Sequence, residues 1–236
     1  MTYKLLWMSG CPNVWCTMLG MKIKGIEYDS LRVDSEQLSL IASKFHPMDP
    51  RSKVPTLQDG TTRIYESIAI LVYLEIKHPE NPLFGVEPVQ TALVWQRILE
   101  VINNLRDPLF VGITQPIYKS QSESIKQAAI DKMHDALFWV DQMLLDTQYL
   151  AGDFLSAADL VFMPYVQSLL RAIKSTNRDQ INFGIFPLEK TYLNIAMWLK
   201  RIEEAPSYQD AYPPHWKNQN SHSLRKAILR CKPSEF

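Results

Sequence analysis

The chain has 236 residues, of which 46% are hydrophobic and 21% charged, and its 25 basic and 25 acidic residues give a formal net charge of zero. This composition is typical of a folded protein and argues against a chain that is disordered throughout. The balanced charge provides neither the basic surplus typical of nucleic-acid binding nor an acidic surplus that would attract a cationic partner. The length predicts one large domain or two small ones.

The number of cysteines and the length of the apolar segments bear on the cellular location of the protein. The three cysteines are Cys11, Cys16 and Cys231, and so small and odd a number argues against the disulfide framework of a secreted protein. No apolar run approaches the roughly 20 residues that span a bilayer, and the first ten residues lack the apolar core of a signal peptide. We therefore expect a reducing, cytoplasmic location without membrane contact. The five histidines show no metal-ligand spacing, so no metal is expected.

The first part of the chain alternates strand and helix patterns. Residues 3–8 predict a buried strand, residues 12–24 a helix that starts at a proline and stops before a glycine, and residues 26–33 a second strand. A strand, a helix and a strand in succession indicate a parallel pair joined by a right-handed crossover. Residues 36–46 show a weaker helix pattern.

A hairpin and another helix complete this part. Asp59-Gly60 stands between two short apolar runs, which is a hairpin signal, and an apolar helix pattern begins at Ser67. The order βαβαββα is thioredoxin-like. We therefore predict a thioredoxin-like domain over residues 1–78.

Beyond residue 78 the pattern changes. Residues 79–88 contain three prolines and a glycine and are interpreted as a linker. Apolar residues then recur at helical intervals, which predicts an all-helical second domain over 89–236. The predicted helices cover 89–117, 122–146, 157–174 and 188–204. No role can be assigned to the tail from about residue 211.

Three local motifs stand out. Val54-Pro55 precedes the hairpin, and Glu66-Ser67 stands at the start of the next helix. In the second domain, Ser156 and Asp159 have the spacing of an N-capping box, with Asp in the role usually taken by Glu. The third motif is Ser9-Gly10-Cys11-Pro12, which joins the first strand to the first helix. A helix N-terminus stabilises a thiolate, so Cys11 is either a reactive thiol or a small buried side chain at a junction.

With these motifs in its predicted order of elements, the chain resembles the cytosolic glutathione transferases as far as about Tyr208. The resemblance implies a cis Val54–Pro55 bond that presents the backbone of Val54 to the cysteinyl part of glutathione. It also implies that Ser67 binds the γ-glutamyl carboxylate and that Glu66 holds the nearby ammonium group. The glycine carboxylate is assigned to Lys53, with Arg51 as a weaker candidate.

The same resemblance implies that Cys11 occupies the catalytic position of the family. A cysteine there is similar to the omega-like and related bacterial-type branches, which carry out disulfide exchange more than conjugation. A serine-type interpretation with Ser9 remains if the loop is shifted. Cys16 stands where many members have an arginine, and we expect it to be a core residue. The proposed role of Cys11, attack on a glutathione mixed disulfide or stabilisation of a bound glutathione thiolate, requires a depressed pKa.

The resemblance implies a glutathione-dependent transferase that carries out thiol transfer, or conjugation of glutathione to a small electrophile. Glutathione-dependent dehalogenation, ether cleavage or isomerisation, and a non-catalytic binding protein with this fold, are the alternatives. Most relatives are homodimers. Asn103, Asn104 and Arg106 lie where the family places its second-substrate wall, or face solvent or a dimer partner. The sequence does not identify the second substrate.

Overall fold

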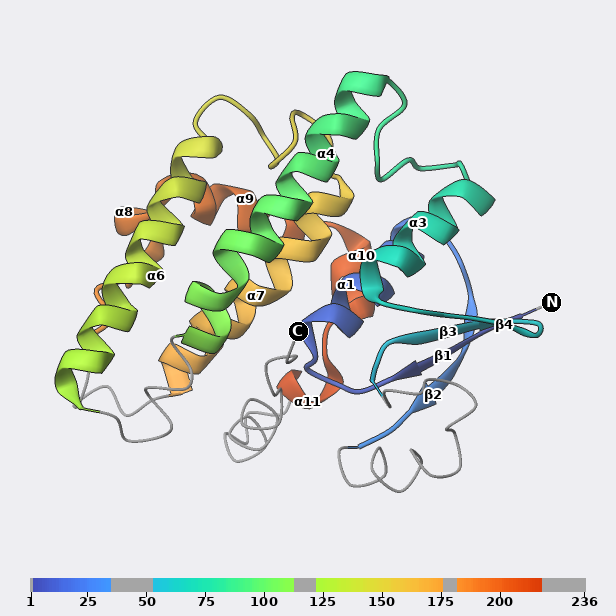
Figure 1. Ribbon diagram of the computed structural model, residues 1–236, viewed down its shortest axis with the longest axis horizontal. Helices are drawn as coiled ribbons and strands as arrows, with labels where there is room; N and C mark the ends of the chain where they lie inside the picture. Colours follow the sequence, from blue (N-terminus) through green and yellow to red (C-terminus); the bar gives the residue numbers. More distant parts are fainter. Residues whose placement is uncertain (1, 35–52, 113–121, 176–181, 218–236) are drawn as a thin grey trace. The chain divides into compact units, whose positions relative to one another are not determined.

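The computed structural model describes residues 2–34, 53–112, 122–175 and 182–217. These residues form two compact units (Figure 1). Unit 1 contains the described residues up to Leu83 and those from Pro206 onward, and unit 2 contains those from Phe84 to Ala205. Within the described ranges, no helix combines the length and the apolar character that crossing a bilayer requires.

Unit 1 is built on a four-stranded sheet with the order β2-β1-β3-β4. The strands are β1 (Tyr3–Trp7), β2 (Tyr28–Arg32), β3 (Thr56–Asp59) and β4 (Thr62–Tyr65). Strands β1 and β2 are parallel, whereas β3 is antiparallel to both β1 and β4. The thioredoxin-like topology and the hairpin at Asp59-Gly60 are therefore confirmed. The helix predicted over 36–46 lies outside the described residues.

Helices α1 (Pro12–Ile23) and α3 (Ser67–Lys77) belong to the same unit and pack against each other. Helix α1 starts at a proline, whose missing N–H would have no partner in a first turn, and ends before Gly25, which has a φ of +68°. The apolar side chains between the helices and the sheet form the core of the unit. Leu5, Leu57, Ile70, Leu71 and Leu74 are all fully buried there.

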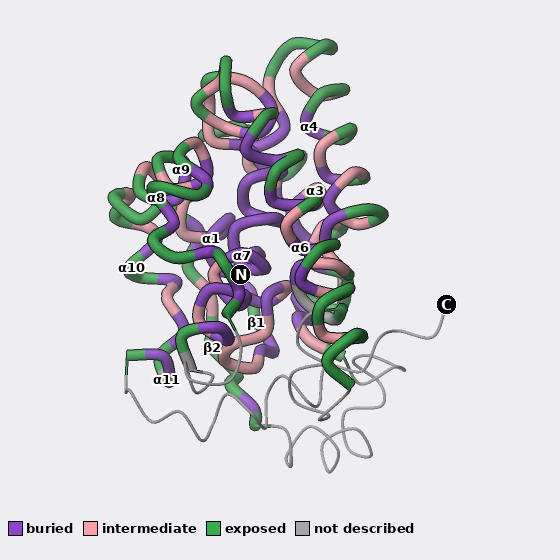
Figure 2. The backbone as a smooth tube through the Cα atoms, turned by 90° about the vertical axis from the view of Figure 1, so that its left-hand side faces the viewer, coloured by how far each residue is buried: buried purple, intermediate pink, exposed green. Residues whose placement is uncertain are grey.

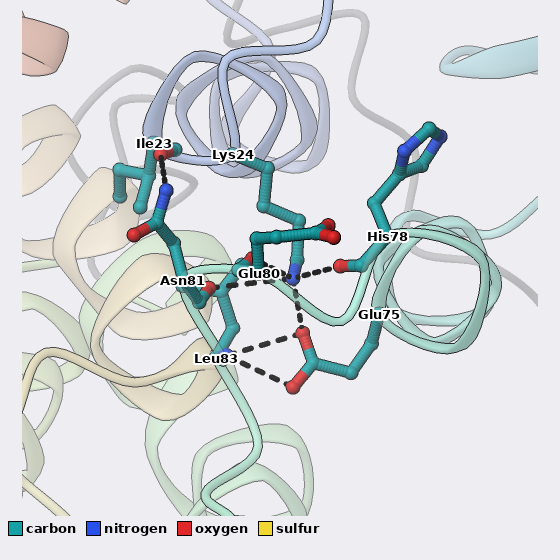
Figure 3. A network of polar contacts seen from close by, with 7 residues as sticks. All are labelled: Ile23, Lys24, Glu75, His78, Glu80, Asn81 and Leu83. Carbon is teal, nitrogen blue, oxygen red and sulfur yellow. Dashed lines mark hydrogen bonds and ion pairs between the residues drawn. The ribbon is translucent and has the colours of Figure 1, made fainter.

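A buried cation ties the end of α1 to the end of α3 (Figure 3). The Lys24 ammonium lies 2.6 Å from the Glu75 carboxylate, and only 1% of the Lys24 side chain is exposed. It also donates to the carbonyl oxygens of His78, Glu80 and Asn81 at 2.9, 3.2 and 3.3 Å. Buried charges are tolerated when they are paired and hydrogen-bonded, and this ammonium has four oxygen partners.

Two short C-terminal helices complete unit 1. They are α10 (Pro206–Ala211) and α11 (Pro214–Lys217), and α10 packs against α1. From the sequence, both segments were expected to belong to the helical second domain. In the structure they are part of the same compact unit as the sheet.

Unit 2 is helical and is centred on α7 (Ala157–Ser175). Figure 2 shows that α7 is buried along most of its length, and its apolar residues are accordingly part of the core. The unit also contains the helices α4 (Pro88–Glu100), α6 (Glu123–Met143), α8 (Leu188–Thr191) and α9 (Leu193–Glu203), of which α4 packs against α7. The helices expected from the sequence in this region are present, although the predicted helix over 188–204 is interrupted at Tyr192.

The segment that follows α4 departs from regular α-helix. It continues as the π-helical stretches η1 (Val101–Leu105) and η2 (Asp107–Val111), within the range where the sequence predicted one helix. Pro108 lies inside the second stretch and has no N–H to donate to the preceding turn, which disfavours regular i→i−4 bonding at this point. The sequence pattern therefore predicted a helix in this range but not its π-helical hydrogen-bond pattern.

The predicted contact between Ser156 and Asp159 is formed at the start of α7, and in it the Ser156 hydroxyl donates a hydrogen bond to the Asp159 carboxylate. Asp159 Oδ2 accepts from the N–H and the hydroxyl of Ser156 at 2.9 and 2.8 Å. Its other oxygen accepts from the Leu150 N–H at 2.9 Å and from the Trp198 indole N–H at 2.8 Å. Burial raises the pKa of Asp159, and the four donors act in the opposite direction. This carboxyl group therefore joins three segments of unit 2.

Candidate functional site

The strand register of unit 1 brings the sequence-predicted site segments to one edge of the sheet (Figure 1). Thr56, the first residue of β3, pairs with Leu6 near the end of β1 and with Tyr65 at the end of β4. The chain therefore leaves β1 toward Cys11, enters β3 from Pro55 and leaves β4 toward Glu66 at the same edge. Three motifs that are up to 55 positions apart in the sequence share this place.

At the entry to β3, the Val54–Pro55 peptide bond is cis, as expected. Pro55 is buried and Val54 is half-buried. Within the described ranges, no residue hydrogen-bonds to the backbone of Val54. Thr56 Oγ1 donates to the carbonyl of Lys53 at 3.2 Å, and Lys53 itself is exposed. Arg51, the weaker candidate, lies outside the described residues.

After β4, the chain turns through a strained residue into α3. Glu66 has φ +71° and ψ 117°, a conformation that L-residues rarely adopt and that costs about 1–3 kcal/mol. Its carbonyl accepts the N–H of Ile70 at 2.9 Å. The N–H groups that precede Ile70 in the first turn of α3 have no partners within the helix, as at any helix N-terminus. Ser67 is buried at the start of this 11-residue helix. Unpaired N–H groups at a helix N-terminus attract carboxylates.

Cys11 is the N-cap residue of α1 and is half-buried. Its carbonyl accepts the N–H of Trp15 at 3.0 Å, and its side chain makes no capping hydrogen bond. Burial raises the pKa of the Cys11 thiol above its ordinary value, and this effect exceeds the opposite effect of the N–H groups of Val14 and Asn13. The pKa shift of Cys11 is therefore opposite in direction to the one that the helix N-terminus alone would cause.

Ser9 and Cys16 differ sharply in their surroundings. Ser9 is half-buried in the turn that precedes Cys11, where Gly10 has a φ of +81°. Cys16 is 2% exposed and belongs to the core, as predicted, and burial raises the pKa of its thiol. Cys231 lies outside the described residues.

The other candidates from the sequence belong to unit 2. Asn103 and Asn104 are exposed in η1, and Arg106 lies 3.2 Å from the carboxylate of Asp107. Among the residues that the structure describes, no three His, Cys, Asp or Glu side chains are grouped in a way that could hold a metal ion. Trp15, which links Cys11 to the C-terminal helices, was not identified from the sequence.

Comparison with known proteins gives consistent matches. The model of the family "Glutathione S-transferase, N-terminal domain" matches residues 1–75. Glutathione S-transferase A of Pleuronectes platessa is 25% identical over 219 residues, which cover 90% of this chain and 92% of the relative. Glutathione S-transferase Z1 of Arabidopsis thaliana is 26% identical over 213 residues, covering 88% of this chain and 89% of the relative.

A solved structure extends the similarity to the fold. The crystal structure of a glutathione S-transferase from the Antarctic clam Laternula elliptica matches with a TM-score of 0.80 and 27% identity. The match covers 97% of this chain and 100% of the clam chain. The similarity therefore extends through both units.

Proposed function

We propose that this chain belongs to the cytosolic glutathione S-transferase superfamily and is a transferase that binds glutathione at the edge of the unit 1 sheet. The sulfur of glutathione would react at the N-terminal end of α1. The observation that carries this proposal is the register at Thr56, because it brings Cys11, Val54 and Glu66 to the same edge.

Each part of the tripeptide has a matching group at this edge. The backbone of Val54 pairs with the cysteinyl unit in the manner of an added strand. The N-terminal N–H groups of α3 and the buried Ser67 receive the γ-glutamyl carboxylate, and the Glu66 carboxylate receives its ammonium group. The exposed Lys53 receives the glycine carboxylate. The strained backbone at Glu66 supports this assignment, because such strain is concentrated at functional sites.

The raised pKa of Cys11 favours conjugation as the main reaction. A Cys11 that stays protonated donates its S–H to the glutathione thiolate. The glutathione thiol loses its proton to solvent, and the thiolate then attacks an electrophilic carbon. The new C–S bond forms as the leaving group departs with the bonding electron pair. The thiol of Cys11 is unchanged at the end of the cycle.

Thiol transfer is the second candidate, and the position of Cys11 at the N-terminus of α1 favours it. In this reaction the Cys11 thiolate attacks the glutathione sulfur of a mixed disulfide, and the other thiolate leaves. A second glutathione thiolate then attacks the glutathione sulfur of the disulfide formed on Cys11. This step releases oxidised glutathione and restores the Cys11 thiolate.

Calorimetric titration with glutathione tests the binding site. We expect Glu66→Ala to weaken binding by about 10- to 100-fold, because one ion pair with the ligand ammonium is lost. Glu80→Ala removes another exposed carboxylate from the same unit and is the matched control. If wild-type protein bound no glutathione, the proposal would be wrong.

Assays with an aryl halide and with a glutathione mixed disulfide separate the two reactions. If conjugation dominates, Cys11→Ser retains part of the aryl halide activity because a hydroxyl still donates a hydrogen bond, whereas Cys11→Ala loses more. If thiol transfer dominates, both variants lose disulfide activity entirely. Binding without either activity would favour the dehalogenase, etherase or isomerase alternatives, or a non-catalytic binding protein. The homodimer remains a prediction.

A further inference from the structure

An aromatic cluster joins α1 to the C-terminal helices within unit 1. It consists of Trp15, Tyr208, Tyr212 and Trp216. The Trp15 ring centroid lies 5.6 Å from that of Tyr208, 5.5 Å from that of Tyr212 and 5.3 Å from that of Trp216. The planes of Tyr212 and Trp216 are inclined at 84° and 87° to Trp15, which is the favoured edge-to-face geometry.

The cluster is buried, although its C-terminal members come from short segments. Trp15 is 2% exposed, Tyr208 3% and Trp216 6%. Helices α10 and α11 have only six and four residues, so intrahelical hydrogen bonds alone would not hold them. Aromatic pairs in this geometry stabilise a structure beyond the effect of the apolar area that they bury. The ring contacts therefore help to hold this segment on α1.

Trp15 connects the aromatic cluster directly to the N-cap of α1. Its backbone N–H donates to the carbonyl of Cys11 at 3.0 Å, which closes the first turn of the helix. Its indole N–H is buried and has no hydrogen-bond partner among the described residues. The orientation of the Trp15 side chain in this part of the chain thus depends on ring packing and not on a polar anchor.

We propose that the aromatic cluster positions Cys11. Packing of Tyr208, Tyr212 and Trp216 on Trp15 sets the first turn of α1, and this turn sets both the burial of the Cys11 sulfur and its place beside the N–H groups of Asn13 and Val14. Trp15 and Trp216 are positioning residues, because they act through the helix and not on a substrate. The consequence for turnover rests on the proposed glutathione transferase function, whereas the consequence for the Cys11 thiol does not.

The test measures the alkylation of Cys11 by iodoacetamide as a function of pH, with the labelled site identified by peptide mass. Trp216→Leu removes a ring that contacts Trp15 but keeps an apolar side chain. Because burial is the larger influence on the thiol, we expect labelling at Cys11 to become about threefold faster or more, with its midpoint moved to lower pH. Trp216→Phe keeps an aromatic ring and restores most of the wild-type profile. Tyr212→Leu, at a half-buried position, gives a milder change and serves if Trp216→Leu does not fold.

Hydrogen exchange gives a second readout of the same contact. The Trp15 amide exchanges faster in Trp216→Leu and in Tyr212→Leu, while the Ile70 amide in α3 keeps its protection. Met133→Ala, a fully buried position in unit 2, is the control for general loss of stability. An unchanged Cys11 profile in both cluster variants, or the same change in Met133→Ala, would overturn the proposal. If the wild-type protein neither bound nor turned over glutathione while the two cluster variants still showed these changes, only the proposed function would be refuted.

Discussion

The Nζ atom of Lys24 lies 2.6 Å from the Oε2 atom of Glu75, with the lysine side chain almost entirely buried (Figure 3). Glu75 also accepts the N–H of Leu83 at 3.0 and 3.1 Å. The pair therefore connects the end of α1, the end of α3 and the last residues of unit 1 before the boundary at residue 83. Because the ammonium group is buried among oxygen partners, we expect its removal to destabilise the fold more than the removal of an exposed ammonium group.

We predict that Lys24→Met lowers the free energy of unfolding by about 3–5 kcal/mol, because the substitution leaves a carboxylate and three carbonyl oxygens without their cation. Urea denaturation followed by circular dichroism measures the loss. Lys22→Met is the matched control, because Lys22 pairs at 3.3 Å with an exposed Glu27, and we expect a change of less than about 1 kcal/mol. Equal effects of the two substitutions would contradict the prediction.

The strained backbone at Glu66 predicts opposite effects on stability and binding. Glycine adopts a positive φ without steric cost, so Glu66→Gly is expected to raise the free energy of unfolding by about 1 kcal/mol. The same substitution removes the carboxylate proposed to bind the ammonium group of glutathione and so weakens binding. Thermal unfolding and calorimetry on one preparation measure both effects. Glu66→Ala is the comparison, because it removes the carboxylate without relieving the strain, and a similar melting temperature for the two variants would argue against strain.

The raised pKa of the Cys11 thiol leads us to predict that the free energy of unfolding depends on pH above the ordinary pKa of 9.0. Because burial raises the pKa of Cys11 in the folded chain, the folded state holds this proton more tightly than the unfolded state. The resulting stabilisation is complete below about pH 9 and is lost as the pH rises toward the folded pKa. Urea denaturation at several pH values measures the loss, and Cys11→Ala should flatten part of it.

Cys16 provides the comparison for that titration, because burial raises the pKa of its thiol as well. Each cysteine-to-alanine variant should remove part of the decline in stability, and the double variant should remove more than either alone. A decline that persisted unchanged in the double variant would assign the pH dependence to other groups.

Asp159 is predicted to be the most sensitive carboxylate in unit 2. Asp159→Ala leaves four buried donors without their acceptor and should lower the free energy of unfolding by at least about 3 kcal/mol. Asp153, an exposed neighbour, accepts the N–H of Gln148 at 3.1 Å, and Asp153→Ala should cost about 1 kcal/mol. Denaturation of both variants compares the two positions. Comparable losses would show that the buried network contributes little.

Features with a local signal were predictable from the sequence. The hairpin at Asp59-Gly60 depends on turn chemistry within a few residues, and α1 is delimited by Pro12 and Gly25. The edge that holds the candidate site was predictable in outline, because a strand order and a hairpin determine which strand ends are neighbours. The wider winding of η1 and η2 was not, since the apolar spacing that predicts a helix does not report its hydrogen-bond pattern.

Features that depend on distant segments were missed. Lys24 is the last residue of the helix predicted over 12–24, but its partners are mostly backbone carbonyls more than 50 positions away, which residue type does not reveal. Tyr208, Tyr212 and Trp216 recur every four residues, yet nothing in that spacing indicates Trp15 as their partner. The raised pKa of Cys11 also depends on distant segments, because helix-end effects are local whereas burial is determined by the whole fold.

Unit 1 is assembled from two pieces of the chain that are separated by more than 120 residues of unit 2. During synthesis, the sheet leaves the ribosome long before α10 and α11 have been translated. Trp15 must therefore wait for its partners while the intervening helices emerge, although domains generally fold from the N-terminus onward. The nascent first unit lacks the ring partners of Trp15 throughout that interval, and a fragment that ends at residue 83 would lack them permanently.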